Sequence, residues 1–168
     1  MLRDRFLAIG GFDTRFRRAE DVEFAYRLAE AGFHFIFDED AIGYHYAERP
    51  FGSWLQNARE YGVNDVVFAR EHGWAEVLER TGHEFRGRHP LVRWMTRTCL
   101  GRPRVEHLVQ RQLRGISSLS DALHAGVLTR FALSGIYNIS YYQGMADQLG
   151  VREFRKIIDR PADGSTRA

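Results

Sequence analysis

The stretch GGFDTRFRRAEDVEFAYRLAEAGFHFIFDEDAIGYHY, residues 10–46, decides which fold the sequence predicts. It brings together a glycine turn, a pair of adjacent carboxylates and a histidine, namely Gly10-Gly11-Phe12-Asp13, Glu20-Asp21 and His45. A carboxylate can remove a proton from a hydroxyl group, and an imidazole can join a metal ion that holds a phosphate. The residues to which chemistry can be assigned are therefore concentrated here, and the rest of the chain reads as support.

Glycines divide this region into short elements. Residues 2–9 are expected to form a helical turn that ends at Gly10 and Gly11, because glycine accepts positive φ angles. A helix is expected over about residues 20–31, with Gly32 in the usual C-terminal cap position. Its apolar face is formed by residues at helical spacing: Val22, Ala25, Tyr26 and Ala29.

Two short strands are predicted after this helix. Residues 33–37 are too short and too aromatic for a helix, and residues 41–46 alternate between two faces. A turn over residues 38–40 joins them. His45 shares its face with an alanine and a glycine, and these small neighbours leave room beside the imidazole for a ligand.

The pattern becomes helical after Pro50. Two strands cannot form a sheet large enough for many helices to cover. We therefore predict a mostly helical α/β fragment, in which the end of a sheet-containing domain is followed by a helical extension. Residues 159–168 are predicted to be a disordered tail. Helices are predicted at residues 52–72, 74–84, 90–98, 104–124, 129–149 and 151–158.

The composition is that of a globular chain. Hydrophobic residues make up 44% of the 168 residues, which is enough for the core of one domain, or of one domain with an extension. Cys99 is the single cysteine, so no internal disulfide can form, which favours a reducing compartment. The sequence shows neither a membrane-spanning apolar run nor a secretory signal. We therefore predict a cytoplasmic location, with peripheral attachment to the inner face of the membrane as an open alternative.

Charge is segregated along the chain, although the net charge is only +2. Residues 19–48 hold eight acidic residues and one arginine, net −7, whereas residues 80–114 hold nine arginines and two glutamates, net +7. The basic segment suits an anionic membrane surface, with Trp94 at the interface, or a solvated face of an arginine-rich protein. No nucleic-acid-binding motif accompanies it, so no nucleic-acid partner is predicted.

Each candidate site residue also has a structural interpretation. Carboxylates such as Glu20 and Asp21 stabilise a helix N-terminus by about 0.3–1 kcal/mol. The glycine turn can serve only to end a helix, with Asp13 bracing the loop. A histidine at a strand end, such as His45, is commonly structural, and the sequence offers no second ligand at metal-motif spacing.

Taken in order, these features resemble the C-terminal half of the catalytic domain in family-2-type glycosyltransferases, which have the Rossmann-like GT-A fold. The resemblance rests on Gly-Gly-Phe-Asp at residues 10–13, Glu-Asp at residues 20–21 and Tyr-His at residues 44–45. It covers about residues 2–72, and the run Tyr141-Tyr142-Gln143-Gly144 also looks like the tail of such enzymes.

The resemblance divides the chain and implies a reaction. It assigns residues 1–72 to the C-terminal part of a glycosyltransferase catalytic domain and residues 73–158 to a helical extension. The reaction would transfer a sugar from a nucleotide-diphosphate sugar to an acceptor hydroxyl, with inversion expected from a single displacement. Enzymes of this kind often act on lipid-linked or membrane-borne acceptors, which would suit a peripheral membrane contact through residues 80–114.

The resemblance also implies a role for each candidate. Asp21 would act as the general base on the acceptor hydroxyl, and Glu20 would position the acceptor. His45 would join a divalent metal, Mn²⁺ or Mg²⁺, whose other ligands lie outside this chain. The pocket where donor sugar and acceptor meet would be lined by the turn residues Gly10, Gly11, Phe12 and Asp13.

The sequence departs from the family pattern at several points. The aspartate pair that holds the metal and nucleotide belongs to the N-terminal half of the family, and Asp38-Glu39-Asp40 is not its equivalent. Ala19 occupies the position before Glu-Asp where glycine is common. The chain joins the family pattern in mid-domain, so we expect a portion of a longer enzyme that is inactive alone. The alternative is a non-catalytic helical interaction module.

Overall fold

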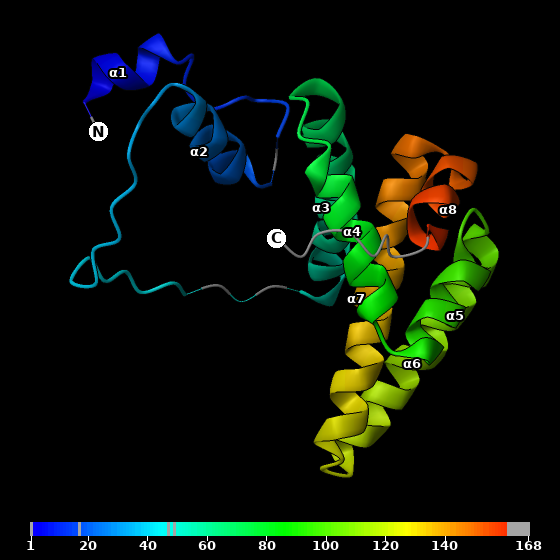
Figure 1. The fold of residues 1–168 in the computed structure, drawn as a ribbon. Helices are drawn as coiled ribbons and strands as arrows, with labels where there is room; N and C mark the ends of the chain where they lie inside the picture. Colours follow the sequence, from blue (N-terminus) through cyan, green and yellow to red (C-terminus); the bar gives the residue numbers. More distant parts are fainter. Residues whose placement is uncertain (1, 17, 47, 49, 161–168) are drawn as a thin grey trace, which may run out of the picture. The chain divides into compact units, whose positions relative to one another are not determined.

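The computed structural model describes residues 2–16, 18–46, 48 and 50–160, and it divides into two compact units between Trp54 and Leu55 (Figure 1). The first unit contains α1 (Arg3–Ala8), α2 (Glu20–Glu30) and the start of α3 (Phe51–Glu71). The second unit contains the rest of α3, followed by α4 (Glu76–Gly87), α5 (Pro90–Cys99), α6 (Pro103–Ala122), α7 (Gly126–Leu149) and α8 (Val151–Asp159).

The prediction of an α/β fold is wrong, because all regular elements in the described part of the chain are helices. Residues 33–37 and 41–46 are outside any strand, and the Phe33 amide only closes the end of α2 by donating to the Leu28 carbonyl. A segment becomes a strand only where a neighbouring strand completes its backbone hydrogen bonds, and the described residues supply no such neighbour. Apart from the half-buried Phe33, the large apolar side chains of these segments are exposed: Phe35, Ile36, Phe37, Ile42, Tyr44 and Tyr46.

The helices predicted from residue spacing are confirmed. α2 matches its predicted bounds to within a residue, and the ends of α3 to α8 differ from their predicted positions by at most three residues. α5 and α6 begin at Pro90 and Pro103, where the missing proline amide costs no helical hydrogen bond. Residues 161–168, most of the predicted disordered tail, lie outside the described residues.

The first unit packs α1 and α2 around three aromatic rings. The Phe12 ring centroid lies 5.4 Å from that of Phe6 on α1 and 5.0 Å from that of Phe24 on α2. Gly11 faces the Phe6 ring so closely that a Cβ atom at this position would lie 3.0 Å from it. Gly11 also has a φ angle of +66°, so the turn requires glycine for both its space and its backbone conformation.

The second unit is organised around α7. Of its 24 residues, 11 are buried, and α5, α6 and α8 all pack against it (Figure 1). No helix in the described ranges is both long enough and apolar enough to cross a membrane. The apolar core draws on residues from α3, α4, α7 and α8 and on the residue after α5: Val66, Phe85, Leu100, Tyr142, Met145, Ala146, Phe154 and Ile158.

Two glycines let α3 and α7 approach each other backbone to backbone. Gly62 on α3 faces the carbonyl of Tyr141, and Gly144 on α7 faces the carbonyl of Arg59. A Cβ atom at either glycine would overlap the carbonyl oxygen that it faces. The Arg59 guanidinium also pairs with Asp147 on α7, so the crossing combines close backbone contact with an ion pair.

Candidate functional site

The predicted carboxylate pair lies at the N-terminus of α2. Glu20 and Asp21 are both exposed, at the end where the helix dipole favours negative charge. Asp21 Oδ1 accepts a hydrogen bond from the Val22 amide at 2.9 Å. The two carboxylates therefore lie in the first turn of a helix and are accessible from solvent.

Arg27 ties the glycine turn to α2. Its Nη1 donates to the Ile9 carbonyl and its Nη2 to the Gly11 carbonyl, both at 2.6 Å. The same guanidinium pairs with Glu23, with Nε 2.5 Å from Oε1 and Nη2 2.8 Å from Oε2. The Glu23 side chain is fully buried, and its hydrogen bond raises the pKa of Arg27. The turn and the helix that carries Glu20 are thereby held together.

The sequence interpretation assigned no site role to Arg27. One signal was available, because Glu23 and Arg27 stand four residues apart on a helix, the spacing of a stabilising ion pair. The contacts with the Ile9 and Gly11 carbonyls left no signal, because they depend on how the turn folds back onto the helix.

Asp13 is engaged by Arg15. Asp13 Oδ1 accepts from the Arg15 amide at 2.9 Å, and Oδ2 accepts from Arg15 Nη2 at 2.7 Å. The side-chain hydrogen bond from Arg15 holds the pKa of Asp13 below its usual value of 3.8. Asp13 therefore braces the turn, which was one of the two roles left open by the sequence, and its contact with a sugar stays a prediction.

The N-cap of α2 has a left-handed backbone. Ala19 has φ 58° and ψ 22°, a region that costs a residue with a Cβ atom roughly 1–2 kcal/mol. This strain gives a physical reason for the glycine expected before the Glu-Asp pair.

Ala19→Gly is expected to slow hydrogen exchange of the α2 amides. The free energy of opening of this helix should rise by about 0.5–1 kcal/mol, after subtraction of the entropic cost of glycine. Ala31→Gly, at the other end of α2 with φ −78°, is the matched control and should give no gain. Equal protection in the two variants would show that the strain at Ala19 is not being relieved.

The structure places His45 in no cluster of metal-ligating side chains among the described residues. It is exposed in the irregular segment 41–46, and the described residues contain no group of three His, Cys, Asp or Glu side chains that could hold a metal ion. The donors among the described residues therefore do not fit Mn²⁺ or Mg²⁺ unless further ligands come from outside this chain. Metal binding by His45 stays a prediction that depends on such ligands.

A second polar cluster lies in the second unit and was not predicted. The Tyr141 hydroxyl donates a hydrogen bond to Asp65 Oδ2 between α7 and α3. Burial raises the pKa of both groups. Because the two residues are far apart in the chain, no spacing pattern could have shown the pair. They border a cavity of about 360 Å³ lined by Tyr61, Asp65, Glu84, Arg88, Tyr137, Asn138 and Tyr141.

Asp65 is expected to make stability fall as the pH rises. Because burial raises its native pKa above 3.8, the native state binds this proton more tightly than the unfolded chain. The resulting stabilisation is complete below the unfolded pKa and is lost as the pH rises through the native pKa. Each unit by which the native pKa of Asp65 exceeds its unfolded pKa corresponds to about 1.4 kcal/mol of unfolding free energy.

Asp65→Asn should therefore reduce the loss of unfolding free energy between acidic and neutral pH, measured by urea denaturation. Its amide oxygen can still accept the hydrogen bond from Tyr141. Asp121→Asn makes the same change at an exposed residue and should keep the original pH profile. A profile that is identical in all three proteins would remove Asp65 as the cause.

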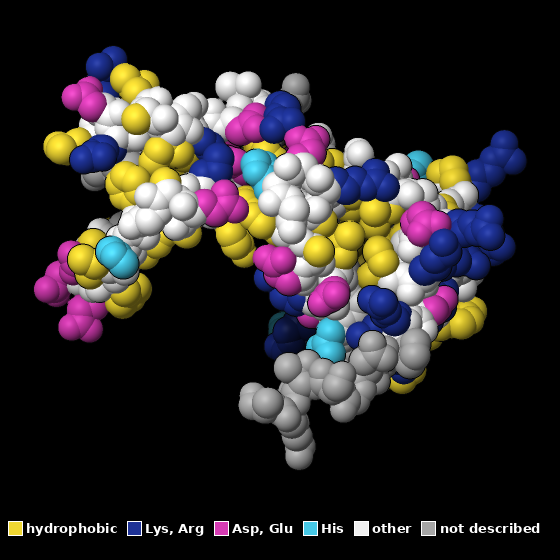
Figure 2. Space-filling view, turned by 45° about the horizontal axis from the view of Figure 1, so that its top comes forward, with side chains coloured by type: hydrophobic (Ala, Val, Ile, Leu, Met, Phe, Trp, Pro, Cys, Tyr) yellow, Lys and Arg dark blue, Asp and Glu magenta, His cyan; other side chains and the backbone are white. Residues whose placement is uncertain are grey.

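Part of the charge in residues 80–114 is used inside the second unit. Arg97 pairs with Asp159 on α8 at 2.7 Å, and Arg93 Nη1 donates to the Arg86 carbonyl at 3.2 Å. Figure 2 shows Lys and Arg side chains gathered over one side of this unit, with acidic side chains among them. The basic segment is therefore partly structural and only partly an accessible cationic surface.

Comparison with known proteins finds no relative: no protein-family model, curated protein or solved structure matches the chain. A functional conclusion therefore depends on the residues and contacts described above.

Proposed function

We propose that this chain is the acceptor-side portion of a glycosyltransferase, which moves a sugar from a nucleotide-diphosphate sugar to a hydroxyl group. The observation that carries the proposal is an accessible carboxylate pair on a restrained support. Glu20 and Asp21 are exposed at the start of α2, and Arg27 holds the turn before them through two carbonyl groups. A general base must be both accessible and well positioned. The residue order that resembles family-2-type glycosyltransferases supplies the choice of reaction.

In this reaction Asp21 takes the proton of the acceptor hydroxyl as the hydroxyl oxygen attacks the anomeric carbon. The bond from that carbon to the diphosphate oxygen breaks, and the nucleoside diphosphate leaves with the electron pair. Attack from the side opposite the leaving group inverts the configuration. Glu20 accepts a hydrogen bond from the acceptor, and the half-exposed ring of Phe12 offers an apolar contact to the sugar.

A transfer assay tests the proposal. A polypeptide that joins this chain to a nucleotide-binding half is incubated with nucleotide sugars, Mn²⁺ and hydroxyl acceptors. Release of nucleoside diphosphate and formation of a glycosylated product are measured together. We expect transfer by the joined polypeptide and none above background by the chain alone. Donor binding without turnover on any acceptor would contradict the proposal.

One observation favours a non-catalytic interaction module as the second candidate. Residues 33–46 expose a series of large apolar side chains, with Phe37 and Tyr46 92% and 94% exposed. Large apolar side chains exposed in this number within one segment are typical of a contact with another protein. The transfer assay separates the two functions, because an interaction module gives no product.

We also propose contact between residues 80–114 and an anionic membrane surface, which would place the enzyme near lipid-linked acceptors. On α5, Leu91 and Trp94 are 44% and 62% exposed within this arginine-rich segment. Interfacial tryptophan and neighbouring cations are typical of peripheral membrane binding.

The chain is therefore expected to sediment with phosphatidylglycerol vesicles at low salt and to be released at high salt, because salt screens the attraction. Phosphatidylcholine vesicles are the uncharged control, and Trp94→Ala should weaken binding to the anionic vesicles. Binding that ignores both salt and lipid charge, or no binding at all, would exclude this contact.

A further inference from the structure

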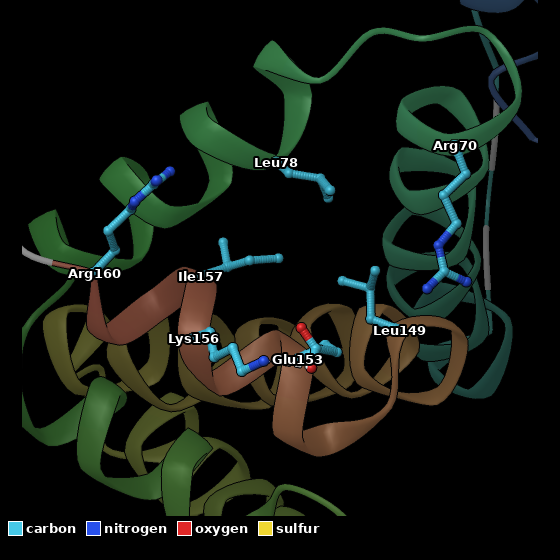
Figure 3. Close-up of a pocket in the computed structure, with 7 residues that line it drawn as sticks. All are labelled: Arg70, Leu78, Leu149, Glu153, Lys156, Ile157 and Arg160. Atoms are coloured by element: carbon cyan, nitrogen blue, oxygen red, sulfur yellow. Dashed lines mark hydrogen bonds and ion pairs between the residues drawn. The ribbon is translucent and has the colours of Figure 1, made fainter.

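A pocket of about 380 Å³ in the second unit combines an apolar lining with charged side chains at its edge (Figure 3). Leu78 from α4, Leu149 from α7 and Ile157 from α8 point into the same space. The volume falls in the lower part of the range for small-molecule sites, about 300–1,000 Å³. The lining therefore provides room for a short hydrocarbon chain.

The charges around this space are mainly positive. Its charged lining residues are Arg70, Glu153, Lys156 and Arg160. Lys156 lies 2.7 Å from Glu153, and their hydrogen bond lowers the pKa of Glu153, so the carboxylate is ionised and its charge is offset. Arg70 Nη1 donates to the Gln148 carbonyl at 3.0 Å. This bond orients the guanidinium and uses only one of its five N–H donors.

We propose that this pocket binds an amphiphile with one anionic head group, of the alkyl carboxylate or alkyl phosphate class. The head group pairs with Arg70, since a guanidinium matches either anion with two parallel hydrogen bonds. The hydrocarbon chain covers Leu78, Leu149 and Ile157. A small inorganic anion would leave this apolar lining in water, and an uncharged amphiphile would leave the cations without a counter-charge. The inference does not depend on sugar transfer, because the pocket belongs wholly to the second unit.

Calorimetric titration of the full chain with four probes below their micellar concentrations tests this assignment. The probes are octyl phosphate, octanoate, octanol and inorganic phosphate. At least one anionic amphiphile should bind about tenfold or more tightly than both octanol and inorganic phosphate. Tighter binding of octyl phosphate identifies a phosphate head group, and tighter binding of octanoate identifies a carboxylate. Equal binding of octanol, or no binding of either anionic amphiphile, would overturn the proposal.

Variants locate the binding. Arg70→Gln should weaken the binding of the tighter-binding anionic probe about tenfold and leave the affinity for octanol unchanged. Arg152→Gln removes the same charge from α8 at an exposed position outside the pocket lining and should have no effect. If Arg70→Gln lowers the melting temperature, Arg160→Gln provides a second test, because Arg160 lies beyond the end of α8. Equal weakening by Arg152→Gln, or none in the two lining variants, would place the binding elsewhere.

Discussion

Asp21→Asn is expected to lower the kcat of sugar transfer by about 10²–10⁴-fold, the usual effect of losing a general base. The measurement uses a polypeptide that joins this chain to a nucleotide-binding half. The variant loses the basic carboxylate but keeps an oxygen that can accept the hydrogen bond of 2.9 Å from the Val22 amide. The first turn of α2 therefore keeps its structure, and the KM for the donor should change little.

Two further variants separate catalysis from general charge effects. Glu20→Gln removes the neighbouring carboxylate and should raise the KM for the acceptor more than it lowers kcat. Asp121→Asn makes the same chemical change at an exposed residue of α6 and should alter neither constant. A normal rate in the Asp21→Asn variant would remove Asp21 from the role of base.

Helices were predictable here because their hydrogen bonds and capping signals are local. The bounds of α2, and the starts of α5 and α6 at prolines, follow from residues within one or two helical turns. Residues 33–37 and 41–46 were assigned wrongly as strands, because a strand depends on a partner strand that can come from any part of a sequence. In the structure, most of the large apolar side chains of these segments are instead exposed on irregular backbone.

The candidate site was predictable only in part, for the same reason. Glu20 and Asp21 could be placed at a helix N-terminus because the helix itself could be predicted. Arg27 contacts two carbonyls of the turn in the first unit, and Tyr141 contacts Asp65 in the second unit. Each contact joins segments that are brought together by tertiary packing. No residue spacing encodes such contacts, so the support of the site had to come from the structure.

Gly144→Ala is expected to destabilise the second unit by about 3 kcal/mol or more, because it inserts a methyl group between two backbones. Overpacking typically costs about 1–3 kcal/mol when side chains can move aside. Here the obstacle is the Arg59 carbonyl on α3, which can move only with its helix. The higher helix propensity of alanine returns about 1 kcal/mol, too little to offset the clash. Domains of this size have unfolding free energies of about 5–15 kcal/mol, so the loss is measurable by urea denaturation.

Gly62→Ala tests the same contact from the other helix, since its methyl group meets the Tyr141 carbonyl. Its cost should be similar, and the double variant should cost less than the sum, because one separation of α3 from α7 relieves both clashes. Gly115→Ala is the matched control: this glycine lies within α6, is exposed, and has no atom within 4 Å of a new Cβ. It should stabilise the chain by up to about 1 kcal/mol. If Gly144→Ala behaved like Gly115→Ala, α3 and α7 would not be in backbone contact, and the Asp65–Tyr141 pair between them would lose its structural basis.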